Sequence, residues 1–173
     1  MRKIAALVDH ELTWTQCSTF KSEFELRFGG DIVGTLRFPK MMSTRAEAES
    51  GDGSWTFERV GFWKMRIIVR ASGSTSELGS YRSNAWKGGG VLELSDGRKF
   101  NVARSVWKST LEFQTEAGEP LVHIKNKGVF RISASVRMNR KVLQVPEFPW
   151  LVLLGLYLTI MARNDAATHA ATG

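Results

Sequence analysis

Cysteine is nearly absent from this chain of 173 residues, in which Cys17 is the only thiol. A single cysteine excludes an intramolecular disulfide and any zinc or iron–sulfur site built from several cysteine ligands. Proline is also scarce, at four residues, whereas 43% of the residues are hydrophobic. This composition is typical of a globular chain, and the length suits one domain of roughly 150 residues.

The sequence has no apolar run long enough to cross a bilayer. Near the N-terminus five apolar residues, Ile4 to Val8, precede Asp9, fewer than the roughly 7–15 in the hydrophobic region of a signal peptide. Near the C-terminus the thirteen residues from Trp150 to Ala162 are almost wholly apolar, but a spanning helix needs about 20. We therefore expect a cytoplasmic, monomeric protein without a transmembrane span, which meets membranes only peripherally.

The alternation of strands and helices that a parallel sheet requires is also missing. Hydrophobic residues instead recur at every second position, most clearly over residues 130–138, where the even positions are apolar and the odd ones are Arg or Ser. This period predicts strands with one buried and one solvated face. Turn sequences such as Gly29-Gly30-Asp31 and Ser95-Asp96-Gly97-Arg98 separate the runs, which is typical of β-hairpins.

About twelve short strands are predicted, and this number of consecutive hairpins is the signature of an antiparallel barrel or sandwich. They are expected near residues 14–20, 23–28, 31–38, 44–49, 54–59, 62–70, 76–82, 91–95, 98–104, 106–114, 120–125 and 129–138. The apolar phase of these strands should point several aromatic side chains into the interior, namely Phe24, Phe28, Trp107, Phe113 and Phe130.

The segment from Trp150 to Ala162 breaks the β pattern and predicts a helix over about residues 149–163. Pro149 suits a first helical turn and Arg163 suits the negative end of the helix dipole. At about 1.5 Å per residue this helix is roughly 20 Å long, less than the roughly 30 Å hydrocarbon core of a bilayer. A helix that is apolar all round must be buried on all sides, so we expect the barrel to enclose it. Residues 1–163 then form one domain, and residues 164–173 a flexible tail.

In this architecture the chain resembles the tubby C-terminal-like superfamily, which includes the phospholipid scramblases and the LURP-one-related proteins. The resemblance covers nearly the whole chain and rests on the run of short hairpins, including the Leu94–Phe100 turn, and on the closing helix from Trp150 to Ala162. It implies a mainly β fold, a closed antiparallel barrel of about twelve strands around a hydrophobic C-terminal helix. It also implies association with membranes or phosphoinositides, as in several members. No lipid-binding residue or calcium site of the family can be carried over position by position.

Positive charge is concentrated in the later part of the chain. Residues 1–60 hold 8 Lys and Arg against 9 Asp and Glu, whereas residues 61–173 hold 16 against 8. Between Glu119 and Glu147 no acidic residue interrupts six cations, which are Lys125, Lys127, Arg131, Arg137, Arg140 and Lys141. Several unneutralised cations attract polyanions or anionic lipid headgroups, so these six residues are the candidate binding site for an anionic membrane surface. Alternatively, the basic face only keeps the protein soluble while it serves as a protein-interaction scaffold.

Nucleic acid is a second possible partner, because single strands bind to aromatic platforms flanked by cations. Most aromatic residues fall on the predicted interior phase, which speaks against this function. Five are less clearly placed, and a position at the rim of the barrel is open for them: Trp55, Phe57, Phe62, Trp63 and Trp86.

An enzyme with a nucleophilic cysteine would need a base near Cys17, and the only histidines are His10, His123 and His169. The Asp9-His10-Glu11 run does not match the spacing of a zinc site. The pairs Glu23/Glu25 and Glu47/Glu49 would each share a strand face, but the sequence indicates no cleft around them. We therefore expect a binding protein rather than an enzyme, with no metal or cofactor.

Overall fold

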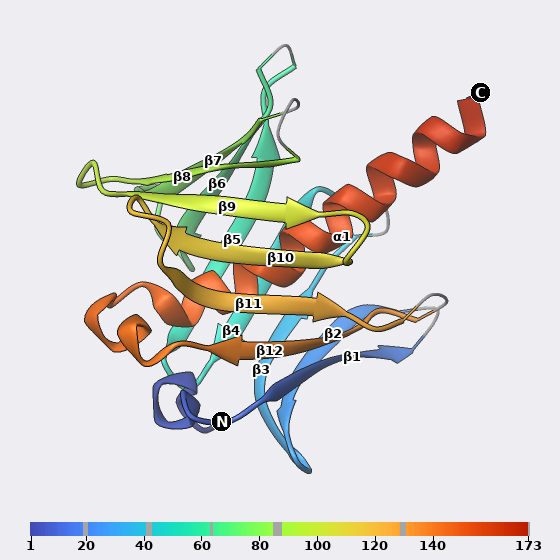
Figure 1. Ribbon diagram of the computed structural model, residues 1–173. Coiled ribbons are helices and arrows are strands. Elements are labelled where there is room, and N and C mark those ends of the chain that lie inside the picture. Colours follow the sequence, from blue (N-terminus) through green and yellow to red (C-terminus); the bar gives the residue numbers. More distant parts are fainter. Residues whose placement is uncertain (19–20, 41–42, 63, 85–87, 129–130, 173) are drawn as a thin grey trace.

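The computed structural model describes residues 1–18, 21–40, 43–62, 64–84, 88–128 and 131–172. Within these ranges twelve antiparallel strands follow one another as hairpins, and the last strand pairs with the first to close a barrel (Figure 1). The predicted fold class is confirmed. Every neighbouring pair is sequential except β1 with β12. The loops that lead from an odd-numbered to an even-numbered strand (odd-to-even connections) therefore lie at one end of the barrel, and the loops from an even-numbered to an odd-numbered strand lie at the other.

The strands are β1 (Leu12–Ser18), β2 (Lys21–Phe28), β3 (Asp31–Arg37), β4 (Arg45–Ser50), β5 (Gly53–Val60), β6 (Arg66–Ala71), β7 (Glu77–Asn84), β8 (Gly89–Leu94), β9 (Lys99–Ser105), β10 (Thr110–Thr115), β11 (Pro120–Asn126) and β12 (Ser133–Met138). Two 3₁₀ helices, η1 (Ile4–Leu7) and η2 (Arg140–Gln144), lie before β1 and after β12, and α1 (Phe148–Thr172) ends the described chain.

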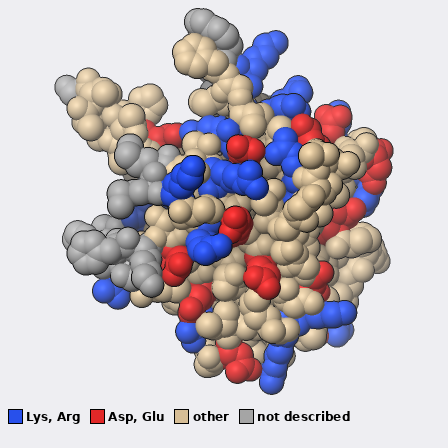
Figure 2. Space-filling view, turned by 180° about the vertical axis from the view of Figure 1, so that it is seen from behind, with Lys and Arg blue, Asp and Glu red and all other residues tan. Residues whose placement is uncertain are grey.

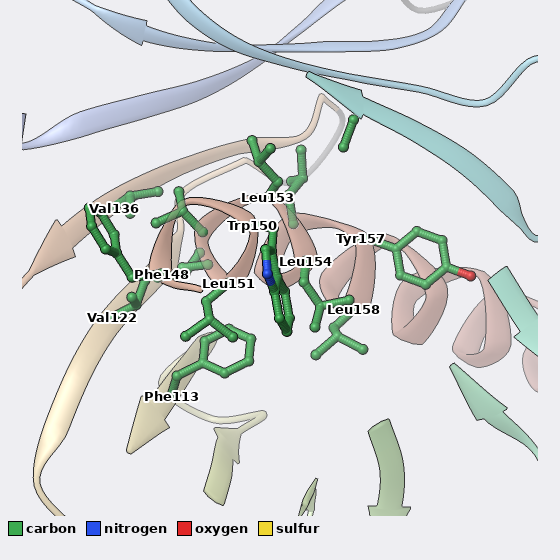
Figure 3. Close-up of a cluster of buried hydrophobic side chains, with 14 of the residues drawn as sticks. Phe113, Val122, Val136, Phe148, Trp150, Leu151, Leu153, Leu154, Tyr157 and Leu158 are labelled. Carbon is green, nitrogen blue, oxygen red and sulfur yellow. The ribbon is translucent and has the colours of Figure 1, made fainter. Parts of the chain in front are cut away.

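The helix α1 fills the barrel. Its side chains from Phe148 to Met161 are all buried, and they meet inward-facing strand residues such as Phe113 and Val136 (Figure 3). Fourteen residues at about 1.5 Å each give a buried length of roughly 21 Å, which matches the expected length of the apolar segment. The helix therefore forms the centre of the core, and the inner faces of the strands surround it.

The end of α1 differs from the prediction. The helix was expected to end near residue 163, with a flexible tail after it, but it continues to Thr172. Alanine is the best helix former, and four of the last eight residues of α1 are alanine. Asp165 adds a tertiary contact, because its carboxylate accepts two hydrogen bonds from the Arg59 guanidinium at 2.8 and 2.9 Å.

Trp107 also differs from the prediction. It was expected to face the interior, but it lies in the turn between β9 and β10 and is 100% exposed. The strand β10 begins only at Thr110, because a tight turn interrupts the alternation: the Ser109 amide donates to the Val106 carbonyl at 3.1 Å, and Ser109 has a positive φ of 52°.

The other interior aromatic residues follow the prediction where they are described. Phe24 and Phe113 are buried, and Phe28 is half-buried against the core. Of the aromatic residues without a clear placement, Trp55 and Phe57 are buried and Phe62 is 86% exposed. Phe130, Trp63 and Trp86 lie outside the described residues.

Candidate functional site

The six predicted cations do not form one patch. Lys125 is the penultimate residue of β11, and Lys127 and Arg131 lie in the connection to β12, at the end of the barrel through which α1 leaves. Arg137 lies near the far end of β12, and Arg140 and Lys141 belong to η2 at the opposite end. The sequence window therefore divides between the two ends of the barrel.

Four of these cations are matched by carboxylates from elsewhere in the chain. Glu11 accepts from Arg137 Nε at 2.6 Å and from Lys127 Nζ at 3.4 Å. The remaining two pairs are Arg140 with Asp9, at 3.0 Å, and Lys141 with Glu119. These carboxylates lie outside the acid-free window in the sequence, and the closure of β1 on β12 and the β10–β11 hairpin bring them beside it.

The hydrogen bond from Arg137 holds the pKa of Glu11 below its usual value, with the charge of Lys127 acting in the same direction. Glu11 therefore stays ionised to a lower pH than an unpaired glutamate and continues to offset both cations. Lys125 and Arg131 are exposed, and within the described parts of the chain neither has an ion-pair partner. They are the two members of the predicted set whose charge is available to a partner.

A broader basic feature lies at the end where α1 leaves the barrel. Asp165 of α1 binds Arg59 near the end of β5, and Arg163 Nη1 donates to the Gly128 carbonyl at 3.4 Å, so the helix passes out between the odd-to-even connections (Figure 1). We call the described residues of these connections the helix-exit rim; they are 38–40, 43–44, 61–62, 64–65, 88, 106–109, 127–128 and 131–132.

The helix-exit rim carries charge of one sign. Its described residues include five cations and neither Asp nor Glu: Lys40, Lys64, Lys108, Lys127 and Arg131. The connections at the opposite end contain one cation, Arg98, and four acidic residues, which are Asp52, Asp96, Glu116 and Glu119. The charge is therefore distributed unevenly along the barrel axis, and the positive end is at the helix-exit rim.

Elsewhere the surface mixes both signs. On the face seen in Figure 2, Lys and Arg side chains are interspersed with Asp and Glu. Ion pairs between neighbouring strands account for part of this mixing, for example Arg37 with Glu47 at 2.6 Å on β3 and β4, and Arg70 with Glu58 at 3.3 Å on β6 and β5.

The helix-exit rim also carries exposed apolar side chains. Seven large hydrophobic residues are exposed in the described chain, and four of them lie on two of its hairpin turns: Phe62, Met65, Val106 and Trp107. The exposed fractions are 86% for Phe62 and 100% for Trp107. Each of the two turns carries two of these side chains and one lysine, Lys64 or Lys108. Exposed apolar side chains that gather in this way are typical of interaction surfaces.

Just inside the rim, the mouth of the barrel holds polar side chains around α1. Arg59 is half-buried there, and its guanidinium binds the Asp165 carboxylate. Burial raises the pKa of the Tyr81 hydroxyl, and nearby Ser83 and Arg104 partly oppose this shift. Arg104 itself has no ion-pair partner among the described residues. The mouth therefore holds two arginines directly behind the exposed turns: Arg59, which is paired with Asp165, and Arg104, whose charge is not matched by an acidic residue of the described chain.

The predicted carboxylate pairs do share a cleft, which the sequence did not indicate. A groove of about 520 Å³ on the outer face of β1 to β5 is lined by Glu23, Glu25, Glu47 and Glu49 together with Cys17. Two of these glutamates are bound by arginines: Glu25 by Arg27 and Glu47 by Arg37, each at 2.6 Å.

Cys17 is exposed, and partial desolvation together with a hydrogen bond to Glu25 raises the pKa of its thiol. This direction disfavours the thiolate that a nucleophile needs. The histidines have other neighbours: the ring of His10 lies against Phe28, and His123 Nδ1 lies 3.0 Å from Glu112. In the described chain no three His, Cys, Asp or Glu side chains gather as metal ligands.

Sequence reasoning missed Trp107, Lys108, Lys64 and Arg104 as site residues. A usable signal was present, because in a barrel of sequential hairpins every second connection lies at the same end. Of the charged residues in these connections, one group then contains only cations, and the other contains four acids and one arginine. Within the described residues, no helix is both long and apolar enough to cross a membrane.

Comparison with known proteins gives a fold relationship. No family model matches the sequence, and no curated protein does either. Among solved structures, the chain is similar to the X-ray structure of a protein from Arabidopsis thaliana, with a TM-score of 0.53 and 16% identity over 82% of this chain and 89% of that one. At this identity the likeness concerns the fold alone.

Proposed function

We propose that this protein is a non-catalytic binding protein that docks on anionic membrane surfaces through its helix-exit rim. The observation that carries the proposal is that the described connections at one end of the barrel carry cations, no acidic residue and exposed apolar side chains. Anionic lipids attract each Lys or Arg near the surface by about 1 kcal/mol. Tryptophan favours the interface between headgroups and acyl chains, where its ring is buried and its N–H stays hydrated.

The placement of the aromatic residues favours a membrane over nucleic acid. Single-stranded nucleic acid binds along a groove in which successive bases stack on aromatic side chains. Trp14, Trp55 and Trp150 are buried in the core, so they offer no such platform. Phe62 and Trp107 instead lie exposed at two separate turns, the β5–β6 and β9–β10 connections, where they do not form one stacking groove.

The proposal is tested by co-sedimentation with vesicles of phosphatidylcholine alone and of phosphatidylcholine mixed with phosphatidylserine. We expect binding to the mixed vesicles only, weakening as salt rises because the surface charges are screened. Trp107→Ser should weaken binding about tenfold, since burying a large apolar side chain contributes roughly 1.5–3 kcal/mol. Its matched control is Leu143→Ser, which alters an exposed side chain of η2 at the opposite end and should leave binding unchanged.

The electrostatic part has its own pair of variants. Lys64→Gln combined with Lys108→Gln removes two rim charges, and Lys3→Gln combined with Lys99→Gln removes two charges at the other end. Only the first pair should weaken binding. Equal binding to neutral and mixed vesicles, or equal effects of the two pairs, would overturn the proposal. Retention on single-stranded DNA that exceeds binding to the mixed vesicles would assign the rim to nucleic acid instead.

A further inference from the structure

Two adjoining cavities open at the mouth of the barrel, directly behind the rim turn that holds Trp107. The first has a volume of about 300 Å³ and lies between α1, the β9–β10 turn and the end of β11. The second has a volume of about 240 Å³ and lies between α1 and strands β5, β6, β7, β9 and β10. Arg104 and Leu111 line both cavities. Together they fall within the roughly 300–1,000 Å³ that small-molecule sites occupy.

The first cavity has the lining of an anion site. Arg104 and Arg163 contribute guanidinium groups, and Ser105, Ser109 and Thr110 contribute hydroxyls, whereas no carboxylate lies among its described lining residues. A guanidinium can donate two parallel hydrogen bonds to the oxygens of a phosphate or carboxylate. Arg104 has no anionic partner within the described chain, so a bound anion would supply the partner it lacks.

The same cavity holds a buried acceptor without a donor. The Oδ1 atom of Asn126 is inaccessible to solvent and accepts no hydrogen bond from the described residues. Leaving such an atom unpaired costs about 1–3 kcal/mol. Because this atom faces away from solvent, the Asn126 side chain must turn toward the cavity before a ligand hydroxyl can donate to it. The hydrogen bond then removes this cost, which favours a hydroxylated headgroup over a simple anion.

The second cavity differs in character. Ile67, Val102, Leu111, Leu158 and Met161 give it apolar walls. Its one carboxylate, Asp165, is already bound by Arg59 at 2.8 and 2.9 Å. An apolar space that shares an arginine with an anion site is suited to a molecule that has both an anionic headgroup and an apolar chain.

We infer that the mouth of the barrel binds one phosphate-bearing amphiphile with a hydroxylated headgroup. The phosphate lies against Arg104, the headgroup hydroxyl donates to Asn126, and the chain enters the cavity beside Leu158 and Met161. This inference takes the membrane as the source of the ligand from the proposed function, but its chemistry rests on the two cavities alone.

The test is isothermal titration of the full chain with three soluble probes. Dihexanoyl phosphatidylglycerol below its micellar concentration carries the phosphate, the hydroxyls and short chains. Glycerol 3-phosphate lacks the chains, and dihexanoyl phosphatidylcholine lacks the hydroxyls and the net negative charge. We expect the first probe to bind most tightly. If glycerol 3-phosphate binds equally well, the source is a free phosphate compound and the assignment of an amphiphile is overturned.

Substitution of Arg104 locates the site. Arg104→Gln should weaken binding of dihexanoyl phosphatidylglycerol about tenfold or more, the usual effect of losing a hydrogen bond to a charged group. Arg104→Lys should give an intermediate loss, because it keeps the charge without the fork. The matched control is Arg82→Gln, which removes an equally exposed charge from β7 outside both cavities.

Equal affinities of the Arg104→Gln and Arg82→Gln proteins would overturn the inference, provided that both unfold at the wild-type temperature. If either variant unfolds at a lower temperature, two other variants are used: Thr110→Val removes a hydroxyl from the first cavity, and Asn126→Leu removes the amide. Unchanged binding of dihexanoyl phosphatidylglycerol by both would overturn the inference. If the protein binds the soluble lipid but does not dock on anionic vesicles, the proposed function is overturned and the lipid site is kept. If it docks on the vesicles but does not bind the soluble lipid, only the site is overturned.

Discussion

Glu11 and Arg137 are joined by a hydrogen bond of 2.6 Å although 126 positions separate them in the sequence. Glu11 lies just before β1 and Arg137 near the end of β12, so the contact forms only because these two strands close the barrel. The same carboxylate also reaches Lys127 of the helix-exit rim at 3.4 Å. Glu11 therefore reduces the positive charge that the rim presents.

Removal of this carboxylate should strengthen docking. Glu11→Gln frees Lys127, and at about 1 kcal/mol per cation near an anionic surface we expect vesicle affinity to rise several-fold. The comparison is Glu93→Gln, which changes the net charge equally but frees Lys99, a cation outside the helix-exit rim that lies 3.9 Å from Glu93. Affinities measured by vesicle co-sedimentation should differ between the two variants. An equal increase would mean that only total charge matters.

Both tyrosines should resist ionisation. Burial is the main cause that raises the pKa values of Tyr81 and Tyr157 above 10, and the Tyr157 hydroxyl also donates to the Thr44 carbonyl. Since the folded-state pKa is raised, the stabilising contribution is complete below the unfolded value near 10 and is lost as the pH rises above it. The chain has only two tyrosines, so phenolate absorbance at alkaline pH reports on both.

In this titration we expect less phenolate at pH 10 than two solvent-exposed tyrosines would give, and a rise at higher pH together with loss of the folded circular dichroism signal. Tyr157→Phe should reduce the free energy of unfolding by roughly 1 kcal/mol through loss of one hydrogen bond. A reversible phenolate transition with a midpoint near 10 in the folded protein would show that the mouth is open to water around these rings.

Gly155 allows α1 to approach β10 and β11 closely. A Cβ atom at this position would lie 2.2 Å from Ile124 Cδ1 and 3.2 Å from Phe113 Cε2. Gly155→Val should therefore reduce the free energy of unfolding by about 1–3 kcal/mol, as overpacked cores do. The double variant with Ile124→Ala removes the clashing atoms and should be more stable than the sum of the two single changes predicts. Strict additivity in denaturant unfolding would contradict this packing.

The sequence predicted the fold because its dominant signals are local. Alternation with period two defines the strands, and the segment from Trp150 to Ala162 has no polar face, so it can be stable in water only when it is enclosed. The end of α1 was harder to place, since Asn164 and Asp165 are typical of helix termini. The helix nevertheless continues beyond them, and Asp165 makes a tertiary ion pair with Arg59 that the sequence does not reveal.

The candidate site was predicted less completely, because charge balance is a property of neighbours in space. An acid-free window in the sequence does not remain acid-free once β1 lies beside β12, as the pairing of Arg140 with Asp9 shows. The exposure of Trp107 depended on where the β9–β10 turn begins. A shift of a few residues in that turn decides whether Trp107 points into the core or into solvent.

The orientation of the barrel on a membrane can be measured directly, because Cys17 is the only native cysteine. In a Cys17→Ser background, Trp107→Cys places a thiol on the helix-exit rim and Leu143→Cys places one on η2 at the opposite end. Each is labelled with an environment-sensitive fluorophore and mixed with vesicles of phosphatidylcholine and phosphatidylserine. We predict a blue shift and quenching by nitroxide-labelled lipid at position 107 only. Equal responses at both positions, or a response at position 143 alone, would contradict docking through the rim.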